Sequence, residues 1–176
     1  MKKLLIVIDY QKDFVDGTLG FPGAETLDEP IAQKIASYRS SGDDVAFTLD
    51  THGKDYLQSQ EGRKLPVTHC LRGTPGWELY GKTGMARSPE DAVIEKPAFP
   101  SLELGTLLRE KAYDRVELVG LVSYICVISN AVIAKAALPE AEIVVDARCT
   151  AGPDPQLHQK ALDVMENALQ ITVTHR

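Results

Sequence analysis

The sequence VGLVSYICVISNAVIAKAAL, residues 119–138, is the most informative part of this chain about its fold. It begins with the end of an apolar run that is short enough for a buried strand. The run passes through Gly120 into a short turn and continues as a helical pattern that starts at Ser123 or Tyr124. A strand that leads through a short turn into a helix is the first half of a β-α-β unit. Cys126 lies in the first turn of the expected helix.

The same alternation of strand and helix runs through the rest of the chain. Short runs rich in Val, Ile and Leu predict buried strands, and the first helix has Asp28 as its expected N-cap and Pro30 in its first turn. Repeated strand and helix imply a three-layer α/β/α fold with a mainly parallel sheet, here in a single domain spanning residues 1–176. The predicted strands are residues 4–8, 45–49, 116–119 and 143–145, with further candidates at 92–95 and 171–173, and the predicted helices are residues 28–40, 101–111, 123–138 and 154–169.

Composition and charge narrow the class of protein. The chain has 176 residues, of which 44% are apolar and 25% are charged, as in ordinary globular proteins. A net charge of -6 without a Lys/Arg cluster argues against a nucleic-acid partner and favours a small-molecule ligand. Three cysteines, an odd number, together with no signal peptide and no long apolar span, predict a soluble cytoplasmic protein with no membrane partner.

One connection is much longer than the others. Residues 51–89 are rich in Gly, Pro, Thr and charged residues, whereas connections usually have a median of about 4 to 6 residues. Long connections of this kind are often functional, so we expect this segment to cover the site.

Reactive side chains follow most of the predicted strands. In open parallel sheets, ligands bind beyond the carboxyl ends of the strands, so residues at these positions are the first candidates for a site. They are Asp9, Asp50, Lys96, Cys126 and Asp146.

Three of these residues have both a structural and a catalytic interpretation. At the start of a helix, the thiol of Cys126 would be shifted toward thiolate, although a free cysteine is also a common buried apolar residue. Asp9 follows LLIVI, close to the core, and therefore needs a partner, for which Lys96 is the natural candidate. The set is either a structural ion pair beside a buried thiol or a base, an electrostatic stabiliser and a nucleophile.

A second group has the chemistry of metal ligands. Asp50 and His52 are two residues apart, so in an extended segment both side chains point to the same face. The stretch EGRKLPVTHC adds Glu61 and His69. Imidazole and carboxylate together suit Zn, Mn or Fe(II), although an Asp-x-His pair also occurs on polar surfaces without a metal.

Other residues have more general interpretations. Phe14, Trp77 and Tyr124 could line a pocket for a flat ring or belong to the core. Cys149 is expected to pack at the end of a strand, and His158 falls in a polar helical pattern that predicts exposure to solvent.

The motifs around these residues resemble those of the isochorismatase-like cysteine hydrolases, most closely the nicotinamidase branch. They occur in family order over nearly the whole chain. The resemblance implies the isochorismatase-like hydrolase fold and an enzyme of NAD salvage that hydrolyses a linear carboxamide C–N bond. The matching stretches are LLIVIDYQKDF, LDTH, LPVTHCLRGTPGWEL, VIEKPAF, VGLVSYICV and VVDA.

The resemblance also implies catalytic roles for individual residues. Asp9, Lys96 and Cys126 match the catalytic triad of the family. A non-proline cis peptide bond is implied just before Val122, and it would turn the backbone N–H groups of Val122 and Cys126 toward a common oxyanion site.

A metal site is implied as well. Asp50, His52 and His69 match metal-site positions of nicotinamidases. Some members have a further histidine in the long connection and others a glutamate, and Glu61 is the best match here. The implied cofactor is a divalent transition metal, Zn, Mn or Fe.

The expected substrate contacts are Phe14, Leu65 and Tyr124. Nicotinamidases commonly place an aromatic residue ahead of the downstream metal histidine, whereas this chain has Leu65. We expect a cysteine amidase that converts nicotinamide and water to nicotinate and ammonia through a thioester. Another cysteine amidase acting on a carbamoyl or ureido compound, or a noncatalytic small-molecule-binding protein of the same fold, remains an alternative. Because family members usually associate, we also expect a homo-oligomer.

Overall fold

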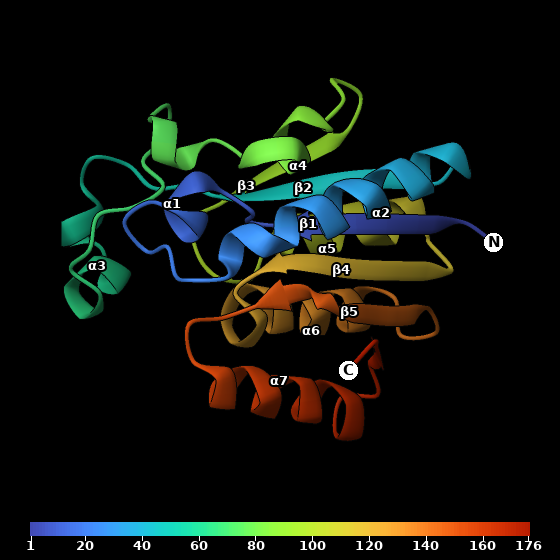
Figure 1. Cartoon of the computed structure of the whole chain (residues 1–176). Coiled ribbons are helices and arrows are strands. Elements are labelled where there is room, and N and C mark those ends of the chain that lie inside the picture. Colours follow the sequence, from blue (N-terminus) through green and yellow to red (C-terminus); the bar gives the residue numbers. More distant parts are fainter.

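A six-stranded sheet runs through the computed structural model, which describes residues 1–176 (Figure 1). Its strand order is β3-β2-β1-β4-β5-β6, and every neighbouring pair is parallel. All six predicted strands are therefore confirmed, and the sheet is parallel throughout. The strands are β1 (Lys3–Ile8), β2 (Asp44–Asp50), β3 (Ala92–Lys96), β4 (Arg115–Leu121), β5 (Glu142–Ala151) and β6 (Thr172–Thr174).

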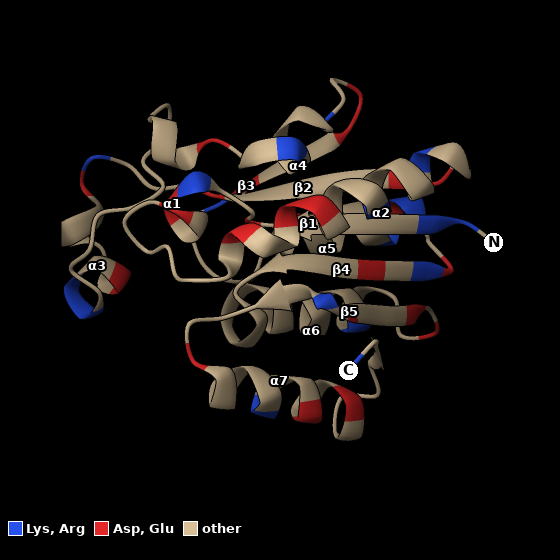
Figure 2. Cartoon of the chain, in the orientation of Figure 1, with Lys and Arg blue, Asp and Glu red and all other residues tan.

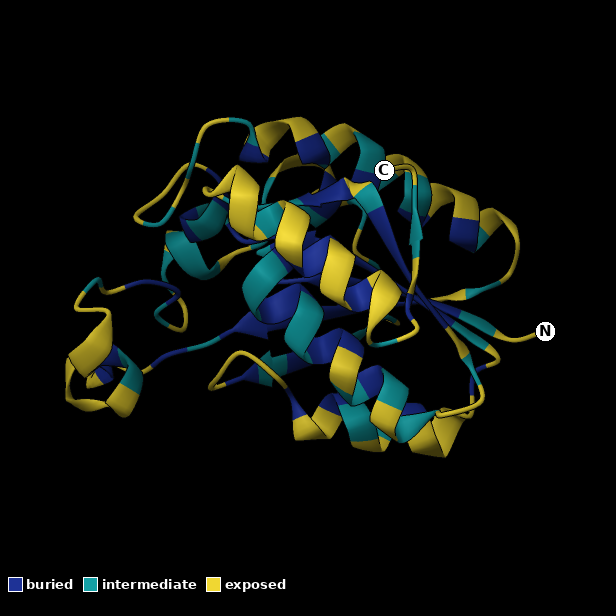
Figure 3. Ribbon diagram, turned by 90° about the horizontal axis from the view of Figure 1, so that it is seen from below, coloured by how far each residue is buried: buried dark blue, intermediate teal, exposed yellow.

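Helices cover both faces of this sheet, as the α/β/α expectation required. Alternate residues of β1 divide between two apolar clusters, because successive side chains of a strand point to opposite faces. Leu4, Ile6 and Ile8 pack with α5 (Leu102–Lys111), α6 (Ile128–Ala137) and α7 (Pro155–Asn167). Leu5 and Val7 pack with α2 (Asp28–Ser40). Figure 3 shows the buried strands between helices whose outer faces are exposed.

The predicted helices are also found, with two differences at their ends. Asp28 does not cap its own helix: its carboxylate accepts hydrogen bonds from the backbone N–H groups of Lys82 and Thr83, both at 2.8 Å, at the start of α4 (Gly81–Met85). The helix predicted at residues 123–138 begins as a π-helical turn, Ser123–Val127, which leads into α6. In both places a tertiary contact or a local backbone change overrides the simple helical pattern.

The long connection between β2 and β3 lies beyond the carboxyl ends of β1 and β2. It contains α3 (Gln60–Lys64), α4 and two 3₁₀ turns, Tyr56–Gln58 and Pro75–Trp77. Isolated bridges join Gln11 to Leu79 and His52 to Leu71, so the segment is fastened to the ends of both strands. The strand order reverses between β1 and β4, and ligands of doubly wound sheets bind at such a point.

The helices carry charges of both signs on their outer faces. Figure 2 shows Lys or Arg together with Asp or Glu on α2 and on α7. No helix of the fold combines the length and the apolar character needed to cross a lipid bilayer.

Candidate active site

Asp9 follows the last residue of β1 and is completely buried. Its backbone takes a left-handed conformation with φ 45°, and the hydroxyl of Thr48 donates a 2.6 Å hydrogen bond to Oδ1. Oδ2 lies 2.5 Å from Nζ of Lys96. Burial raises the pKa of the Asp9 carboxyl, and this effect outweighs the opposing attraction of Lys96.

Lys96 is the last residue of β3 and is also completely buried. Besides Asp9, its ammonium lies 3.7 Å from Sγ of Cys126 and 3.6 Å from Oδ1 of Asp50, and it donates a 3.1 Å hydrogen bond to the carbonyl of Ala98. Burial by itself lowers the pKa of Lys96, but its interactions with Asp9, Cys126 and Asp50 raise it above its ordinary value. The side chain is therefore a cation between three acidic groups.

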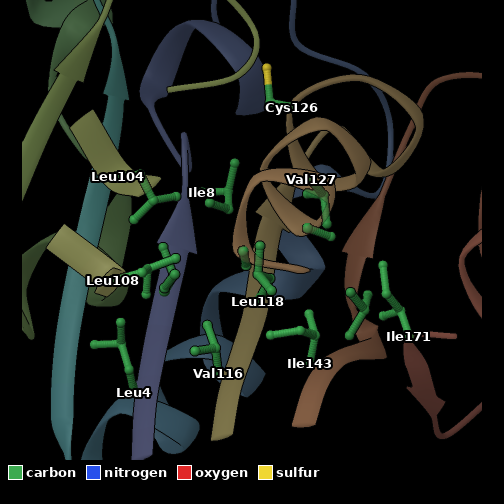
Figure 4. Packing of buried hydrophobic residues seen from close by; sticks show 14 of the residues in the cluster. Leu4, Ile8, Leu104, Leu108, Val116, Leu118, Cys126, Val127, Ile143 and Ile171 are labelled. Carbon is green, nitrogen blue, oxygen red and sulfur yellow. The ribbon is translucent and has the colours of Figure 1, made fainter. Parts of the chain in front are cut away.

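Cys126 lies in the π-helical turn after β4, with only 5% of its surface exposed. Figure 4 shows its sulfur at the end of the apolar cluster, pointing away from Leu118 and Val116. Burial and the charge of Asp9 raise the pKa of the thiol, and Lys96 opposes them less strongly. Burial thus shifts this pKa in the direction opposite to the shift toward thiolate that the helix start predicts.

The backbone before Cys126 has the cis peptide bond that the family resemblance implied. It joins Leu121 to Val122. The backbone N–H of Val122 donates no hydrogen bond within the protein. Gly120, with φ 108°, is required just before this bond, because a Cβ there would lie 2.0 Å from the carbonyl oxygen of Ile8.

The expected metal ligands meet next to this group. Oδ2 of Asp50 lies 2.9 Å from Nε2 of His52 and 3.3 Å from Nε2 of His69, and one ligand atom from each residue falls within 4.8 Å of the others. Glu61 lies close by, with Oε1 at 3.8 Å from His52 and 3.7 Å from His69. The structure thus brings together all four predicted ligands.

These residues fit a divalent metal. Asp50 Oδ1 is buried without a hydrogen-bond partner, and two imidazoles and two carboxylates are the donors of many transition-metal sites. Nδ1 of His69 lies 2.8 Å from the carbonyl of Val67, an arrangement that would leave Nε2 available as a metal ligand. The ring of Tyr56 packs against both histidines, with centroids 4.6 Å from His52 and 5.0 Å from His69.

The expected substrate contacts occupy different surroundings. The ring of Phe14 lies beside His69, with centroids 5.6 Å apart. Leu65 follows α3 and is exposed, and its carbonyl accepts a hydrogen bond from the hydroxyl of Tyr56. The hydroxyl of Tyr124 accepts a hydrogen bond from the backbone N–H of Asp154, so this hydroxyl is engaged at the start of α7.

Two buried polar residues that sequence reasoning missed support the site. The amide of Gln11 donates to the carbonyls of Asp50 and Trp77 and accepts from the N–H of Asp50. The carboxylate of Asp13 accepts a 2.7 Å hydrogen bond from the N–H of Cys70, next to His69. The only available signal was that both occur in YQKDF, directly after the first strand.

Three other sequence candidates lie outside this group. Asp146 does not end β5, which continues to Ala151; its carboxylate is 2.8 Å from Nζ of Lys34 on α2. His158 is not simply solvated, because its Nδ1 lies 2.9 Å from the hydroxyl of Ser123. Cys149 packs in the apolar cluster with α2, in agreement with the expected packing role.

Comparison with known proteins identifies relatives over the full length of the chain. The family model for the isochorismatase domain matches residues 3–176. A Bacillus subtilis (strain 168) protein, described as the uncharacterized isochorismatase family protein PncA, is 33% identical over 181 residues, covering 96% of this chain and 97% of that protein. The nicotinamidase/pyrazinamidase of Mycobacterium tuberculosis is 28% identical over 185 residues, covering 94% and 95%.

Solved structures agree with this relationship. The nicotinamidase/pyrazinamidase PncA from Bacillus subtilis superposes with a TM-score of 0.89 at 31% identity, covering 99% of this chain and 100% of that one. The pyrazinamidase of Pyrococcus horikoshii in complex with zinc has a TM-score of 0.85 at 26% identity, covering all of both chains. N-carbamoylsarcosine amidase from Thermoplasma acidophilum has a TM-score of 0.82 at 28% identity, covering 98% and 95%.

Proposed function

The chain belongs to the isochorismatase family and is a hydrolase acting on an amide C–N bond, and we propose that its substrate is nicotinamide. The products are nicotinate and ammonia, and the reaction passes through a thioester on Cys126. One observation carries the proposal: Lys96 contacts Asp9 at 2.5 Å and the Cys126 sulfur at 3.7 Å, beside the cluster of metal ligands.

Asp9 is the general base in the first half of the reaction. Because burial raises the pKa of the Cys126 thiol, the sulfur carries its proton at rest and needs an acceptor. Asp9 takes this proton as the sulfur attacks the carboxamide carbon. The backbone N–H groups of Val122 and Cys126 stabilise the oxyanion that forms, and the uncommitted N–H of Val122 supports this role.

Asp9 is the general acid when the C–N bond breaks. It returns the proton to the departing nitrogen, which leaves as ammonia, and the acyl group stays on Cys126 as a thioester. Water then attacks the thioester while Asp9 accepts a proton from it, and that proton returns to the sulfur as nicotinate leaves. Throughout, the Lys96 ammonium balances whichever of the two acidic groups is ionised.

The metal ligands have a separate role in binding. Asp50, His52, His69 and Glu61 would hold a divalent metal, which would supply a Lewis acid that the pyridine nitrogen of the substrate could bind as a ligand. Phe14, next to His69, offers an aromatic face for the same ring. Fixing the ring in this way orients the carboxamide toward Cys126.

A second candidate is hydrolysis of a carbamoyl or ureido compound. The observation that favours it is Leu65, an aliphatic side chain where ring stacking would require an aromatic one. The similarity to an N-carbamoylsarcosine amidase at 28% identity is consistent with this substrate class.

An ammonia-release assay tests both candidates. Purified protein is incubated with nicotinamide, pyrazinamide, a carbamoyl amino acid and a ureido acid, with and without a chelator. The proposal predicts the highest kcat/KM for nicotinamide and a loss of turnover after chelation. A higher kcat/KM for the ureido or carbamoyl compound would assign the second function. Absence of ammonia release from every compound would contradict both functions and favour a noncatalytic binding protein.

A further inference from the structure

Asn130 is a buried amide one helical turn after Cys126, on α6. Its side chain makes three hydrogen bonds: Nδ2 donates to the carbonyls of Phe99 at 2.9 Å and Cys126 at 2.8 Å, and Oδ1 accepts from the N–H of Ser101 at 3.0 Å. Both donor hydrogens of the amide and its acceptor are thus used. An unpaired amide at this depth would be costly, so these contacts define where the side chain can sit.

The three contacts join two parts of the chain that the sheet does not bring together. Lys96 ends β3 and Cys126 follows β4, but β2 and β1 lie between these strands in the sheet. No ladder of backbone hydrogen bonds therefore sets the position of one relative to the other. In the segment after Lys96, the carbonyl of Ala98 accepts a hydrogen bond from the Lys96 ammonium. The carbonyl of the next residue, Phe99, accepts one from Asn130.

We propose that Asn130 is a positioning residue that fixes the Lys96 ammonium and the Cys126 sulfur at their working separation of 3.7 Å. Asn130 does not touch the substrate and acts through the two backbone segments that it joins. The inference rests on the proposed function for its role in turnover, and on the contacts alone for its effect on Cys126.

The chemistry at this position requires an amide. Aspartate has the same shape and keeps an acceptor for Ser101, but it would turn oxygen atoms toward the carbonyls of Phe99 and Cys126. Leucine also has a similar shape and would remove all three hydrogen bonds without adding charge. The two variants thus separate loss of the link from the effect of a new carboxylate.

Steady-state kinetics give the first test. Asn130→Leu and Asn130→Asp should each lower kcat by about 100-fold with KM changed by less than about 3-fold, because a misplacement of about 1 Å at the reacting groups has this effect. Ser101→Ala is the matched control. This change removes the hydroxyl that caps α5 by accepting a 3.1 Å hydrogen bond from the N–H of Leu104. It keeps the backbone N–H of residue 101, which donates to Oδ1 of Asn130. It should lower the melting temperature and keep kcat.

Alkylation of Cys126 gives a second test that does not depend on the substrate. The ammonium of Lys96 lowers the pKa of the thiol, so a displaced Lys96 moves the pH midpoint of iodoacetamide labelling upward. Asn130→Leu should show this shift at the peptide containing Cys126, and Ser101→Ala should not. If nicotinamide proves not to be the substrate, this measurement still decides the role of Asn130.

Two results would overturn the inference. One is an Asn130→Leu variant that melts at a lower temperature but keeps wild-type kcat and labelling midpoint, since the residue would then only stabilise the fold. The other is a Ser101→Ala variant that loses as much kcat as the Asn130 variants, since any local loosening would then suffice. If Asn130→Leu does not fold, unchanged kcat in Asn130→Asp has the same meaning.

Discussion

The Lys96 ammonium and the Asp9 carboxylate form an ion pair at 2.5 Å from which solvent is excluded on both sides. Replacing Lys96 with Met would leave a buried carboxylate without a cation, which costs about 3 to 5 kcal/mol of unfolding free energy. We expect this loss in urea unfolding, together with loss of ammonia release. Lys12→Met, which breaks an exposed ion pair with Glu78, should cost about 1 kcal/mol or less. Equal stabilities of the two variants would refute the importance of the buried pair.

Removing the thiol should stop the reaction and spare binding. Cys126→Ala is expected to lower ammonia release by about 10⁴-fold or more, as for other catalytic nucleophiles, and to keep nicotinamide binding in calorimetry. Cys149→Ala, which removes a buried thiol in the α2 cluster, should remain active. Turnover by Cys126→Ala at the wild-type rate would remove the nucleophile assignment.

Metal content should depend on Asp50. This carboxylate contacts both His52 and His69, so Asp50→Ala removes the ligand that lies between them. Elemental analysis of the purified variant should find the transition metal largely lost relative to wild type. Asp55→Ala, at an exposed carboxylate of the same connection, should keep it. Full occupancy in the Asp50 variant would contradict the metal site.

Substrate preference should respond to Leu65. Leu65→Phe adds a ring beside the expected pyridine site, and an aromatic contact of about 1 kcal/mol corresponds to a rise of about 5-fold in kcat/KM for nicotinamide. The rate with a ureido acid should not rise. Leu57→Phe, also at an exposed leucine, is the control. Equal gains in both variants or for both substrates would show that Leu65 does not face the ring.

The stability of the folded protein should depend on pH through the carboxyl of Asp146. Burial alone raises the pKa of this carboxyl, but hydrogen bonds from Arg148 and Lys34 prevail and lower it to about 2. Because the folded state lowers the pKa, the ionised group stabilises the protein above about pH 4, and this contribution of about 2 kcal/mol is lost as the pH falls toward 2. Melting curves of Asp146→Asn should therefore depend less on pH between 5 and 3 than those of wild type.

An exposed carboxylate provides the comparison for this pH dependence. Glu140→Gln, in the turn before β5, should follow the wild-type pH profile. If Asp146→Asn also follows the wild-type profile, the contacts with Lys34 and Arg148 do not stabilise the ionised carboxylate.

The sequence was most informative where local pattern and topology coincide. Asp9, Asp50 and Lys96 each end or follow a short apolar run, and the rule that parallel strands present their carboxyl ends at one edge is enough to place them together. Cys126 was found for the same reason. The local sequence shows the helix start beside Cys126, but it does not show the burial and the charge of Asp9, which raise the pKa of the thiol and arise only in the folded chain.

Residues whose side chains contact distant segments were missed or wrongly placed. In the sequence, Asn130 is a single polar residue in an apolar helical pattern. Its hydrogen-bond partners, the backbone groups of Phe99 and Ser101, lie about 30 positions earlier. Asp146 follows an apolar run and was therefore expected to end a strand. The sequence does not show its contact with Lys34, which lies on an element far away in the chain. Patterns within a window of a few residues carry no record of such partners.

The long connection between β2 and β3 has a consequence for how this protein could be altered. It supplies His52, Glu61 and His69, whereas the acid, the amine and the sulfur come from β1, β3 and the turn after β4. Three of the four proposed metal ligands are thus encoded apart from the proposed cleavage residues, while Asp50, on β2, and Phe14, soon after β1, lie outside the connection. Exchanging residues 51–89 for a connection of different chemistry would retarget the enzyme to another amide while its cleavage apparatus stayed as it is.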